Sequence, residues 1–120
     1  MRVLVTDKIN EIAKNILTEN ANIEVDVLPT MSEDELCEKI SNYDALMIRS
    51  QTKVTKRVLE AGCNLKIVGR AGVGVDNIDV KSATEKGIIV VNSPDGNTIA
   101  AAEHAIAMML SMARNIPRAN

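Results

Sequence analysis

The spacing of apolar residues changes in a regular order along this chain. Short apolar runs such as residues 3–5 and 45–48 are typical of buried strands, whereas residues 9–17 repeat their apolar positions at helical spacing. Five strand patterns alternate with helix patterns and are joined by short connections. This alternation predicts right-handed crossovers and a parallel sheet. We therefore expect an α/β, flavodoxin-like, doubly wound fold with five strands in the order 2-1-3-4-5.

The boundaries of these elements follow from cap and turn residues. Ser32 and Glu35 have the spacing of a helix-capping box, Thr55 can cap the next helix, and Gly62 can end it. We expect strands near residues 3–5, 23–28, 45–48, 65–68 and 88–91, and helices near residues 9–17, 32–40, 55–62, 80–86 and 97–115. The chain of 120 residues is long enough to bury a core, and residues 1–96 are predicted to form one unit.

Composition narrows the class of function. The net charge is −2 and Tyr43 is the sole aromatic residue, which disfavours nucleic acid as a partner because single-strand binders use basic grooves and aromatic stacking. The apolar stretches are shorter than the ~18 residues of a membrane span, which predicts no membrane segment. Cys37 and Cys63 stand in no metal-binding or redox spacing. Both are expected to be reduced thiols of a cytoplasmic protein that holds no metal ion.

The last predicted helix, residues 98–115, is apolar on more of its surface than one sheet could cover. Ile99 and Ile106 lie on one face, and Met108 and Met112 widen the apolar arc. Such a helix needs two neighbours. We expect one of them to lie outside this chain, which makes the helix a candidate dimerisation surface. A fully buried central helix is the alternative.

Arginines and glycines follow the predicted third and fourth strands. Arg49 comes directly after strand three, and Arg70 follows strand four in a loop that contains Gly72 and Gly74. Ligands of open parallel sheets bind outside the carboxyl ends of the strands, so both arginines are expected to face one crevice with Asn97. A guanidinium matches a carboxylate or a phosphate, and loop N–H groups also bind anions. The sequence therefore predicts a site for a small acid with two anionic ends, with an ion pair to a nearby aspartate as the alternative for either arginine.

Other site chemistries fit less well. The glycines at positions 72 and 74 lack the third glycine of a dinucleotide-binding fingerprint, and the residues after them are a poor helix start. A phosphorelay receiver needs an acidic residue where Arg49 stands. His104 is the single histidine, on a mostly apolar helix, and is expected to be structural or interfacial. We therefore expect no catalytic residue and no metal ligand in this chain.

At these positions the chain resembles a known family. The segments LMIRSQTKVT and GRAGVGVDNIDVKSATEKGIIVVNSPDGNTIAAAEHAIAMMLSMARNIPRA are similar to the amino-terminal portion of the D-isomer-specific 2-hydroxyacid dehydrogenases, in particular of those that act on 3-phosphoglycerate. The resemblance implies an NAD-dependent oxidoreductase that converts 3-phosphoglycerate to 3-phosphohydroxypyruvate at the entry to serine biosynthesis. It also implies a substrate domain and a nucleotide domain with a cleft between them.

The same resemblance implies roles for individual residues. Arg49, with Ser50 beside it, matches the position of an arginine that binds the substrate phosphate. Residues 70–74 match the loop that meets the substrate carboxylate, with Val73 beside the nicotinamide, and Asn97 matches an asparagine near the substrate. The helix after Asn97 resembles the first helix of the nucleotide domain, which in the family packs at the dimer interface.

Residues 1–96 are thus expected to form the substrate-binding domain and residues 97–120 the first helix of the nucleotide-binding domain. The family's pyrophosphate-binding loop and its catalytic Arg, Glu and His have no counterpart in this sequence. We therefore expect the isolated chain to be inactive and to bind NADH weakly or not at all. From the residues alone, a non-enzymatic module that binds a small acid or forms a dimer is the second interpretation.

Overall fold

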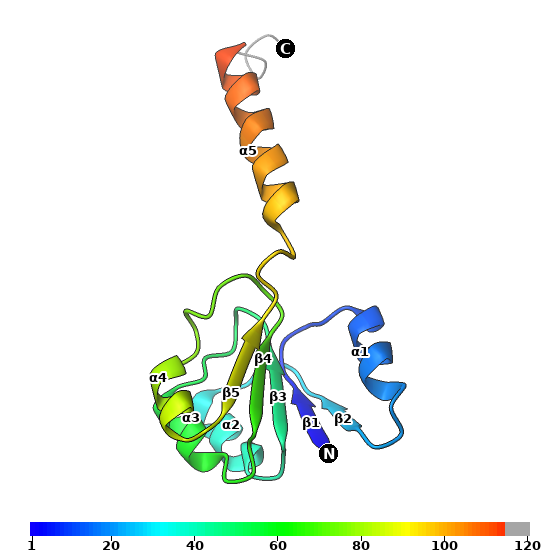
Figure 1. Cartoon of the computed structure of the whole chain (residues 1–120), viewed down its shortest axis with the longest axis vertical. Helices are drawn as coiled ribbons and strands as arrows, with labels where there is room; N and C mark the ends of the chain where they lie inside the picture. The colour runs from blue at the N-terminus through cyan, green and yellow to red at the C-terminus, as the bar shows by residue number, and fades with distance from the viewer. Residues whose placement is uncertain (115–120) are drawn as a thin grey trace.

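A computed structural model of the chain describes residues 1–114. Its parallel sheet has the order β2-β1-β3-β4-β5, and the first four helices pack around it (Figure 1). The strands are β1 (Arg2–Val5), β2 (Glu24–Val27), β3 (Ala45–Ile48), β4 (Ile67–Arg70) and β5 (Ile89–Asn92). The helices are α1 (Glu11–Thr18), α2 (Glu33–Ile40), α3 (Lys56–Ala61), α4 (Val80–Glu85) and α5 (Thr98–Ala113). The predicted fold class and strand order are confirmed.

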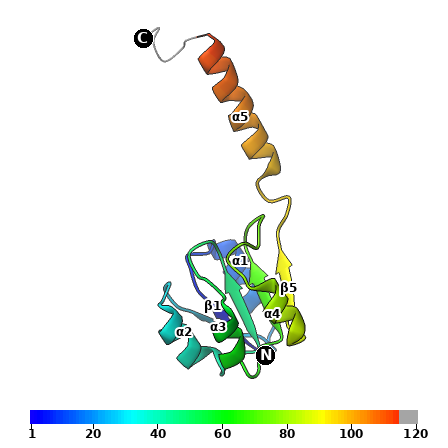
Figure 2. The ribbon, with the colours of Figure 1, turned by 90° about the vertical axis from the view of Figure 1, so that its left-hand side faces the viewer.

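Alternate residues of the central strands pack on opposite faces of the sheet. Leu4, Leu46 and Val68 belong to the larger core, which α2, α3 and α4 cover. Val3 and Val5 belong to the smaller core beside α1. Figure 2 shows α2, α3 and α4 in front of the sheet and α1 behind it. Burial of each such side chain stabilises the fold by about 1.5–3 kcal/mol, so these two layers hold the strand ends in a defined arrangement.

Strand β4, Ile67–Arg70, begins and ends two residues later than the sequence predicted. The expected strand covered residues 65–68, but the observed one ends at Arg70, because Ile48 of β3 and Asn92 of β5 pair with Arg70 from either side. Hydrogen bonds to both neighbouring strands, β3 and β5, outweigh the weak strand preference of a glycine at position 69. Arg70 is therefore the last residue of a strand and not part of the loop that follows.

The predicted helix caps are present. Ser32 accepts a hydrogen bond from the N–H of Glu35 at 3.3 Å, and the Glu35 carboxylate accepts one from the N–H of Ser32 at 2.9 Å. Thr55 accepts a hydrogen bond from the N–H of Val58 at 3.4 Å and so begins α3. Side-chain oxygens thus take the N–H groups that a helix start leaves without a partner. These caps set where the connections from β2 and β3 end.

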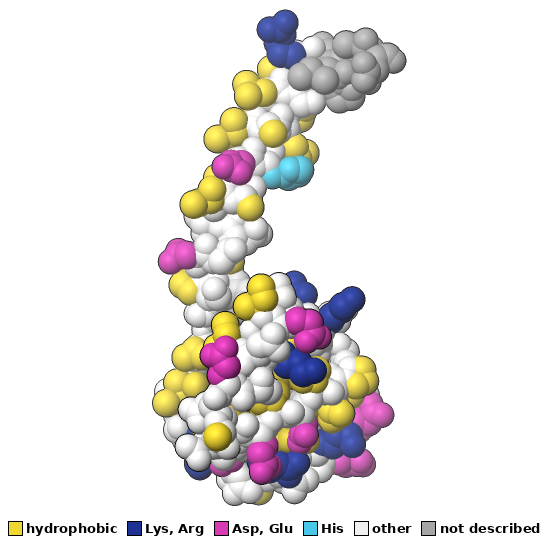
Figure 3. Space-filling view, turned by 90° about the vertical axis from the view of Figure 1, so that its right-hand side faces the viewer, with side chains coloured by type: hydrophobic (Ala, Val, Ile, Leu, Met, Phe, Trp, Pro, Cys, Tyr) yellow, Lys and Arg dark blue, Asp and Glu magenta, His cyan; other side chains and the backbone are white. Residues whose placement is uncertain are grey.

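Helix α5 extends away from the rest of the molecule (Figures 1 and 2). It has 16 residues, which corresponds to about 24 Å, and none of them is buried. Figure 3 shows hydrophobic side chains along its length. The most exposed large ones are Ile99, Ile106, Met108, Met109, Leu110 and Met112. The alternative of a fully buried helix is therefore wrong, and the helix end predicted at residue 115 lies outside the described residues.

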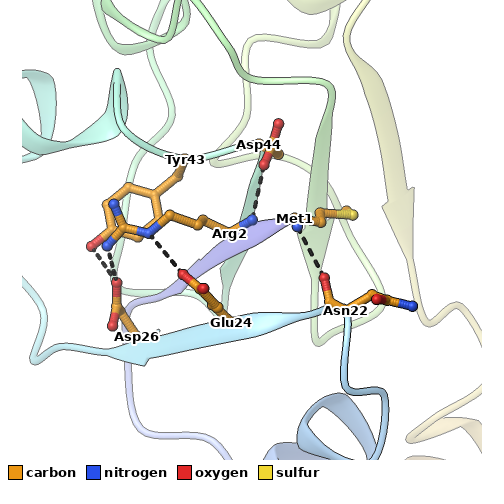
Figure 4. A network of polar contacts seen from close by, with 7 residues as sticks. All are labelled: Met1, Arg2, Asn22, Glu24, Asp26, Tyr43 and Asp44. Atoms are coloured by element: carbon orange, nitrogen blue, oxygen red, sulfur yellow. Dashed lines mark hydrogen bonds and ion pairs between the residues drawn. The ribbon is translucent and has the colours of Figure 1, made fainter.

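Polar side chains tie together the amino ends of β1, β2 and β3 (Figure 4). The Arg2 guanidinium donates to Asp26 at 2.8 Å and lies 4.9 Å from the centre of the Tyr43 ring. The Tyr43 hydroxyl donates to the same Asp26 oxygen at 2.9 Å, and the backbone N–H of Arg2 donates to Asp44 at 2.8 Å. The charged side chains at this edge of the sheet are thus paired with one another.

Candidate functional site at the carboxyl ends of the strands

An open cleft lies at the opposite edge of the sheet, where β3, β4 and β5 end. It has a volume of about 720 Å³. Its lining residues are Arg49, Arg70, Ala71, Gly72, Val73, Gly74, Asp76, Ser93, Gly96 and Asn97. The structure thus brings together every residue proposed for substrate binding except Ser50. Ser50 lines a neighbouring hollow together with Lys53 and Lys56.

Arg70 lies beneath the glycine loop. Its side chain is only 12% exposed, and Nη1 forms an ion pair with Asp76 at 3.1 Å. The Nε atom is buried and has no hydrogen-bond partner among the residues that the structure describes. A Cβ at Gly72 would lie 3.6 Å from that Nε, and a Cβ at Gly74 only 3.0 Å from Nη1. The loop therefore lies close over the guanidinium, which a larger residue at Gly74 would disturb.

The ion pair considered as the alternative for Arg70 is present, but it does not use the whole guanidinium. Asp76 is 86% exposed, and an ion pair with a carboxylate in water contributes about 0–1 kcal/mol. A buried donor without a partner has a larger cost, about 1–3 kcal/mol. The Arg70 Nε stays without a hydrogen-bond partner within residues 1–114, although the guanidinium is paired with Asp76.

Arg49 stands in the first position after β3 and is exposed. Its Nη1 donates to the backbone oxygen of Lys8 at 3.0 Å, and it forms no ion pair with a carboxylate of residues 1–114. The guanidinium accordingly carries an unneutralised positive charge at the mouth of the cleft. Such a group suits a phosphate or a carboxylate, because its planar donors match two oxygens at once.

The glycine loop adds backbone donors to the same cleft. Ser93 donates from its N–H to the oxygen of Gly72 at 3.0 Å, and the side chain of Asn92 donates to the oxygen of Val73. The N–H groups of Val73 and Gly74 have no acceptor within residues 1–114. The loop is thus held by its carbonyl groups, which leaves two N–H groups for an anion.

Val73 and Asn97 complete the lining. The side chain of Val73 is 49% exposed, so it presents an apolar surface at the edge of the cleft. Asn97 precedes α5, but its side chain makes no capping hydrogen bond to that helix. His104 lies further along α5 and does not line the cleft.

Two residues of this region were not among the predicted site residues. Asp7, two residues after β1, and Asn77, after the glycine loop, both form hydrogen bonds to the backbone of Arg49 and Thr52. Burial alone would raise the pKa of the Asp7 carboxyl. Hydrogen bonds from the hydroxyls of Thr52 and Thr30 and from two backbone N–H groups outweigh that effect and hold the pKa below its usual value. An aspartate directly after a buried strand was the one signal of this role in the sequence.

The chemistry available in the cleft is anion binding. Arg49, Arg70 and the glycine loop line the same space, which suits an acid with charges at both ends. None of the helices in residues 1–114 is both long and apolar enough to cross a bilayer. The same residues contain no group of three His, Cys, Asp or Glu side chains placed to bind a metal ion.

Comparison with known proteins identifies the family of this chain. Residues 3–115 match the family described as D-isomer specific 2-hydroxyacid dehydrogenase, catalytic domain. The chain is 58% identical over 119 residues to the D-3-phosphoglycerate dehydrogenase of Synechocystis sp. and 54% identical over 120 residues to that of Archaeoglobus fulgidus. These matches cover 99% and 100% of the chain but only 21% and 23% of the relatives. The chain therefore spans about a fifth of the length of these relatives.

Solved structures have the same fold. The NAD+-bound 3-phosphoglycerate dehydrogenase of Entamoeba histolytica superposes with a TM-score of 0.78 at 31% identity, over 92% of this chain and 38% of that one. The apo D-lactate dehydrogenase of Escherichia coli superposes with a TM-score of 0.73 at 27% identity, over 99% of this chain and 39% of that one. The family match over nearly the whole chain and the common fold lead to one conclusion: the chain belongs to the D-isomer-specific 2-hydroxyacid dehydrogenases.

Proposed function

We propose that this chain forms the substrate side of an NAD-dependent 3-phosphoglycerate dehydrogenase, which oxidises 3-phosphoglycerate to 3-phosphohydroxypyruvate in serine biosynthesis. The observation that carries the proposal is the convergence of Arg49, Arg70 and the glycine loop on one cleft. The named relatives with more than half of their aligned residues in common support the choice of substrate. Residues 1–96 then form the substrate-binding domain, and residues 97–120 belong to the nucleotide-binding domain.

Each end of the substrate has its own partner under this proposal. Arg49 binds the phosphate, because it stands at the mouth of the cleft with an unneutralised charge. The N–H groups of Val73 and Gly74 bind the carboxylate, with Arg70 beneath them. Asn97 lines the same cleft, and Ser50, next to Arg49 in the chain, lines the neighbouring hollow. Two anionic ends held apart in this way orient the C2 carbon between them.

The cofactor of this reaction is NAD, and the chain fits only one part of it. The half-exposed Val73 side chain offers an apolar surface suited to a nicotinamide ring. No G-x-G-x-x-G sequence is present to hold a pyrophosphate. When bound, NAD accepts a hydride from C2 of the substrate. The residues of this chain bind and orient the acid, and the carboxylate among the lining residues, Asp76, is paired with Arg70. We therefore expect the isolated chain to be catalytically inactive.

A titration of the 120-residue chain with 3-phosphoglycerate tests this assignment. Chemical-shift changes of the backbone amides give the dissociation constants for 3-phosphoglycerate and for D-glycerate, which lacks the phosphate. We expect Arg49→Ala to weaken binding of 3-phosphoglycerate about tenfold or more and to leave D-glycerate nearly unchanged, because a charge-assisted hydrogen bond contributes about 1.5–3 kcal/mol. Arg57→Ala, which removes an exposed arginine of α3, is the matched control.

Equal losses for both ligands, or no loss at all, would contradict the phosphate assignment. An assay of the same chain with 3-phosphoglycerate and NAD checks the second part of the proposal. No NADH is expected to form above the background, because the chain has no G-x-G-x-x-G loop to hold the pyrophosphate of the hydride acceptor. Steady turnover would show that the proposed division of the active site is wrong.

We also propose that α5 and the residues after it, 98–115, join two copies of the chain. The support is the row of exposed apolar side chains, among them Met109 at 63% and Leu110 at 61% exposure. A Met109→Asp, Leu110→Asp variant is expected to be monomeric in light scattering where the parent chain is a dimer. A parent chain that stays monomeric at high concentration would overturn this. We further propose a cytoplasmic location, where thiols such as Cys37 and Cys63 stay reduced.

A further inference from the structure

Two side chains from distant parts of the chain hold the segment that carries Arg49. One Asp7 oxygen accepts hydrogen bonds from the N–H of Arg49 at 2.8 Å and from the N–H of Thr52 at 3.1 Å. The amide nitrogen of Asn77 donates to the carbonyl oxygens of the same two residues, both at 2.7 Å. Arg49 and Thr52 are therefore each held through both backbone groups, with the carboxylate on the N–H side and the amide on the carbonyl side.

The Asp7 carboxylate is at the centre of this arrangement. Asp7 is only 3% exposed, and its second oxygen accepts hydrogen bonds from the hydroxyls of Thr52 at 2.6 Å and Thr30 at 2.7 Å. Its backbone adopts φ +67°, in the left-handed region that aspartate tolerates better than most residues. A buried charge and a strained backbone both cost stability, and such features persist where the surrounding structure or a function requires them.

Asn77 is oriented by the segment as well. Both hydrogen bonds from its nitrogen go to carbonyl oxygens, so its own oxygen faces the other way, where it is buried and has no partner among the described residues. Its neighbour Asp76 pairs with Arg70. Asp76 thus contacts the side chain of Arg70, and the adjacent Asn77 contacts the backbone of Arg49.

The side chain of Arg49 depends on the same support. It has one hydrogen bond, from Nη1 to the carbonyl of Lys8, and Lys8 directly follows Asp7. A long exposed side chain has many rotamers, so its direction is set by where its backbone stands and by that single contact. The Asp7–Lys8 pair accordingly holds Arg49 at both its backbone and its guanidinium.

We propose that Asp7 and Asn77 are positioning residues for anion recognition: through the segment 49–52 they set the place from which Arg49 reaches the substrate phosphate. The proposal rests on the function proposed above, in which Arg49 binds that phosphate. Neither residue lines the cleft, so neither touches the ligand directly. Their effect is expected on discrimination between a phosphorylated and an unphosphorylated acid, and not on binding of the carboxylate end.

The test compares the affinity ratio of 3-phosphoglycerate to D-glycerate, measured by amide chemical shifts on the 120-residue chain. Asp7→Ala and Asn77→Ala are each expected to lower this ratio about tenfold, because the lost hydrogen bonds release the segment. Asp7→Asn is expected to keep the ratio within about threefold of the parent. An asparagine tolerates the left-handed backbone, can turn its oxygen toward the two N–H groups, and can donate to the Thr30 and Thr52 hydroxyls, which also accept.

A matched control comes from the other edge of the sheet. Asp44 also accepts the backbone N–H of an arginine, Arg2, at 2.8 Å, but far from the cleft. Asp44→Ala is expected to leave the affinity ratio unchanged. Thermal unfolding of every variant separates loss of folding from loss of positioning, and Asn77→Ala decides the question if Asp7→Ala does not fold.

The variant Arg49→Ala separates the two proposals. If Arg49→Ala does not lower the ratio, the phosphate assignment itself fails. If it does, while folded Asp7→Ala and Asn77→Ala leave the ratio at the parent value, the positioning role is wrong. In the Arg49→Ala background, Asp7→Ala is expected to cause no further loss, because a positioning residue has nothing left to position. An additional tenfold loss there would contradict the mechanism.

Discussion

The arginines at the two ends of the strands differ in how fully their side chains are paired with other groups. At the amino ends of the strands, Arg2 is paired with Asp26, stacked on Tyr43 and held at its backbone by Asp44. At the carboxyl ends, Arg70 has a buried Nε without a partner in the described part of the chain. An edge whose polar groups satisfy one another contributes to stability, whereas an edge that leaves donors unpaired has the capacity to bind a ligand.

Removal of one arginine at each end of the strands is expected to give the largest difference between the two ends. Arg70→Ala is expected to weaken binding of 3-phosphoglycerate about 10- to 100-fold, because it deletes a buried cation at the anion site. Arg2→Ala is expected to lower the unfolding free energy by about 1 kcal/mol, since its ion pair and ring contact are half-exposed, and to leave affinity unchanged. Amide chemical-shift titration and urea unfolding of both variants measure the two effects. A loss of affinity in Arg2→Ala, or none in Arg70→Ala, would remove the distinction between the edges.

Substitution of one glycine at each end of the strands is expected to have smaller effects on stability and affinity. Gly87, before β5 at the amino edge, has φ +71°, and a Cβ added there would meet no atom within 4 Å, so strain alone opposes a larger residue. Gly87→Ala is expected to lower the unfolding free energy by about 1–2 kcal/mol without changing ligand affinity. Gly74→Ala places a Cβ 3.0 Å from Arg70 and 3.1 Å from Asp76, and is expected to lower affinity about threefold with little change in stability. Melting temperatures and ligand titrations of the two variants give the answer, and the reverse pattern would refute it.

The smallest expected difference is in the response to acid. The pKa of Asp7 is lowered in the folded chain, despite the opposing effect of burial, by hydrogen bonds from Thr52, Thr30 and Arg49. A carboxyl with a lowered folded pKa contributes stability that is complete above its unfolded pKa of about 4 and is lost as the pH falls through the folded value. Asp7→Asn is therefore expected to flatten the acid side of the stability curve, measured by urea unfolding from about pH 7 to about pH 3.

Asp44 gives the counterpart at the amino edge. Its pKa is lowered by hydrogen bonds from the backbone of Arg2 and from Lys66, but its side chain is more exposed. Asp44→Asn is expected to flatten the same curve less than Asp7→Asn does. An acid response of the Asp7→Asn variant equal to that of the parent chain would mean that the Asp7 hydrogen bonds do not favour its charged form.

Much of the fold could be predicted because it depends on local pattern. The apolar runs around Leu4, Leu46 and Val68 alternate with helical stretches, and short connections allow few topologies. The capping box at Ser32 could also be predicted, because it depends on the residues from Ser32 to Glu35 alone. The end of β4 at Arg70 was not, because pairing with two neighbouring strands determines it.

The candidate site divides in the same way. Sequence reasoning placed Arg49, Arg70 and the glycine loop at one edge, because parallel strands end on the same side of a sheet. It did not predict the hydrogen bonds of Asp7 and Asn77 to the segment after β3. These residues are separated from that segment by more than forty and more than twenty positions, and their hydrogen bonds exist only when the three strand ends are adjacent.

The class of fold, the order of the strands and the residues that could bind an acid could be predicted, because each depends on residue type and spacing along the chain. Which of their donors have hydrogen-bond partners depends on the folded structure. The Arg70 Nε has no hydrogen-bond partner within residues 1–114 and lies beneath Gly72, whereas the Arg2 guanidinium donates to Asp26 and lies over the Tyr43 ring. The physical reason is that hydrogen-bond saturation depends on partners brought together by the fold, which no local pattern in the chain records.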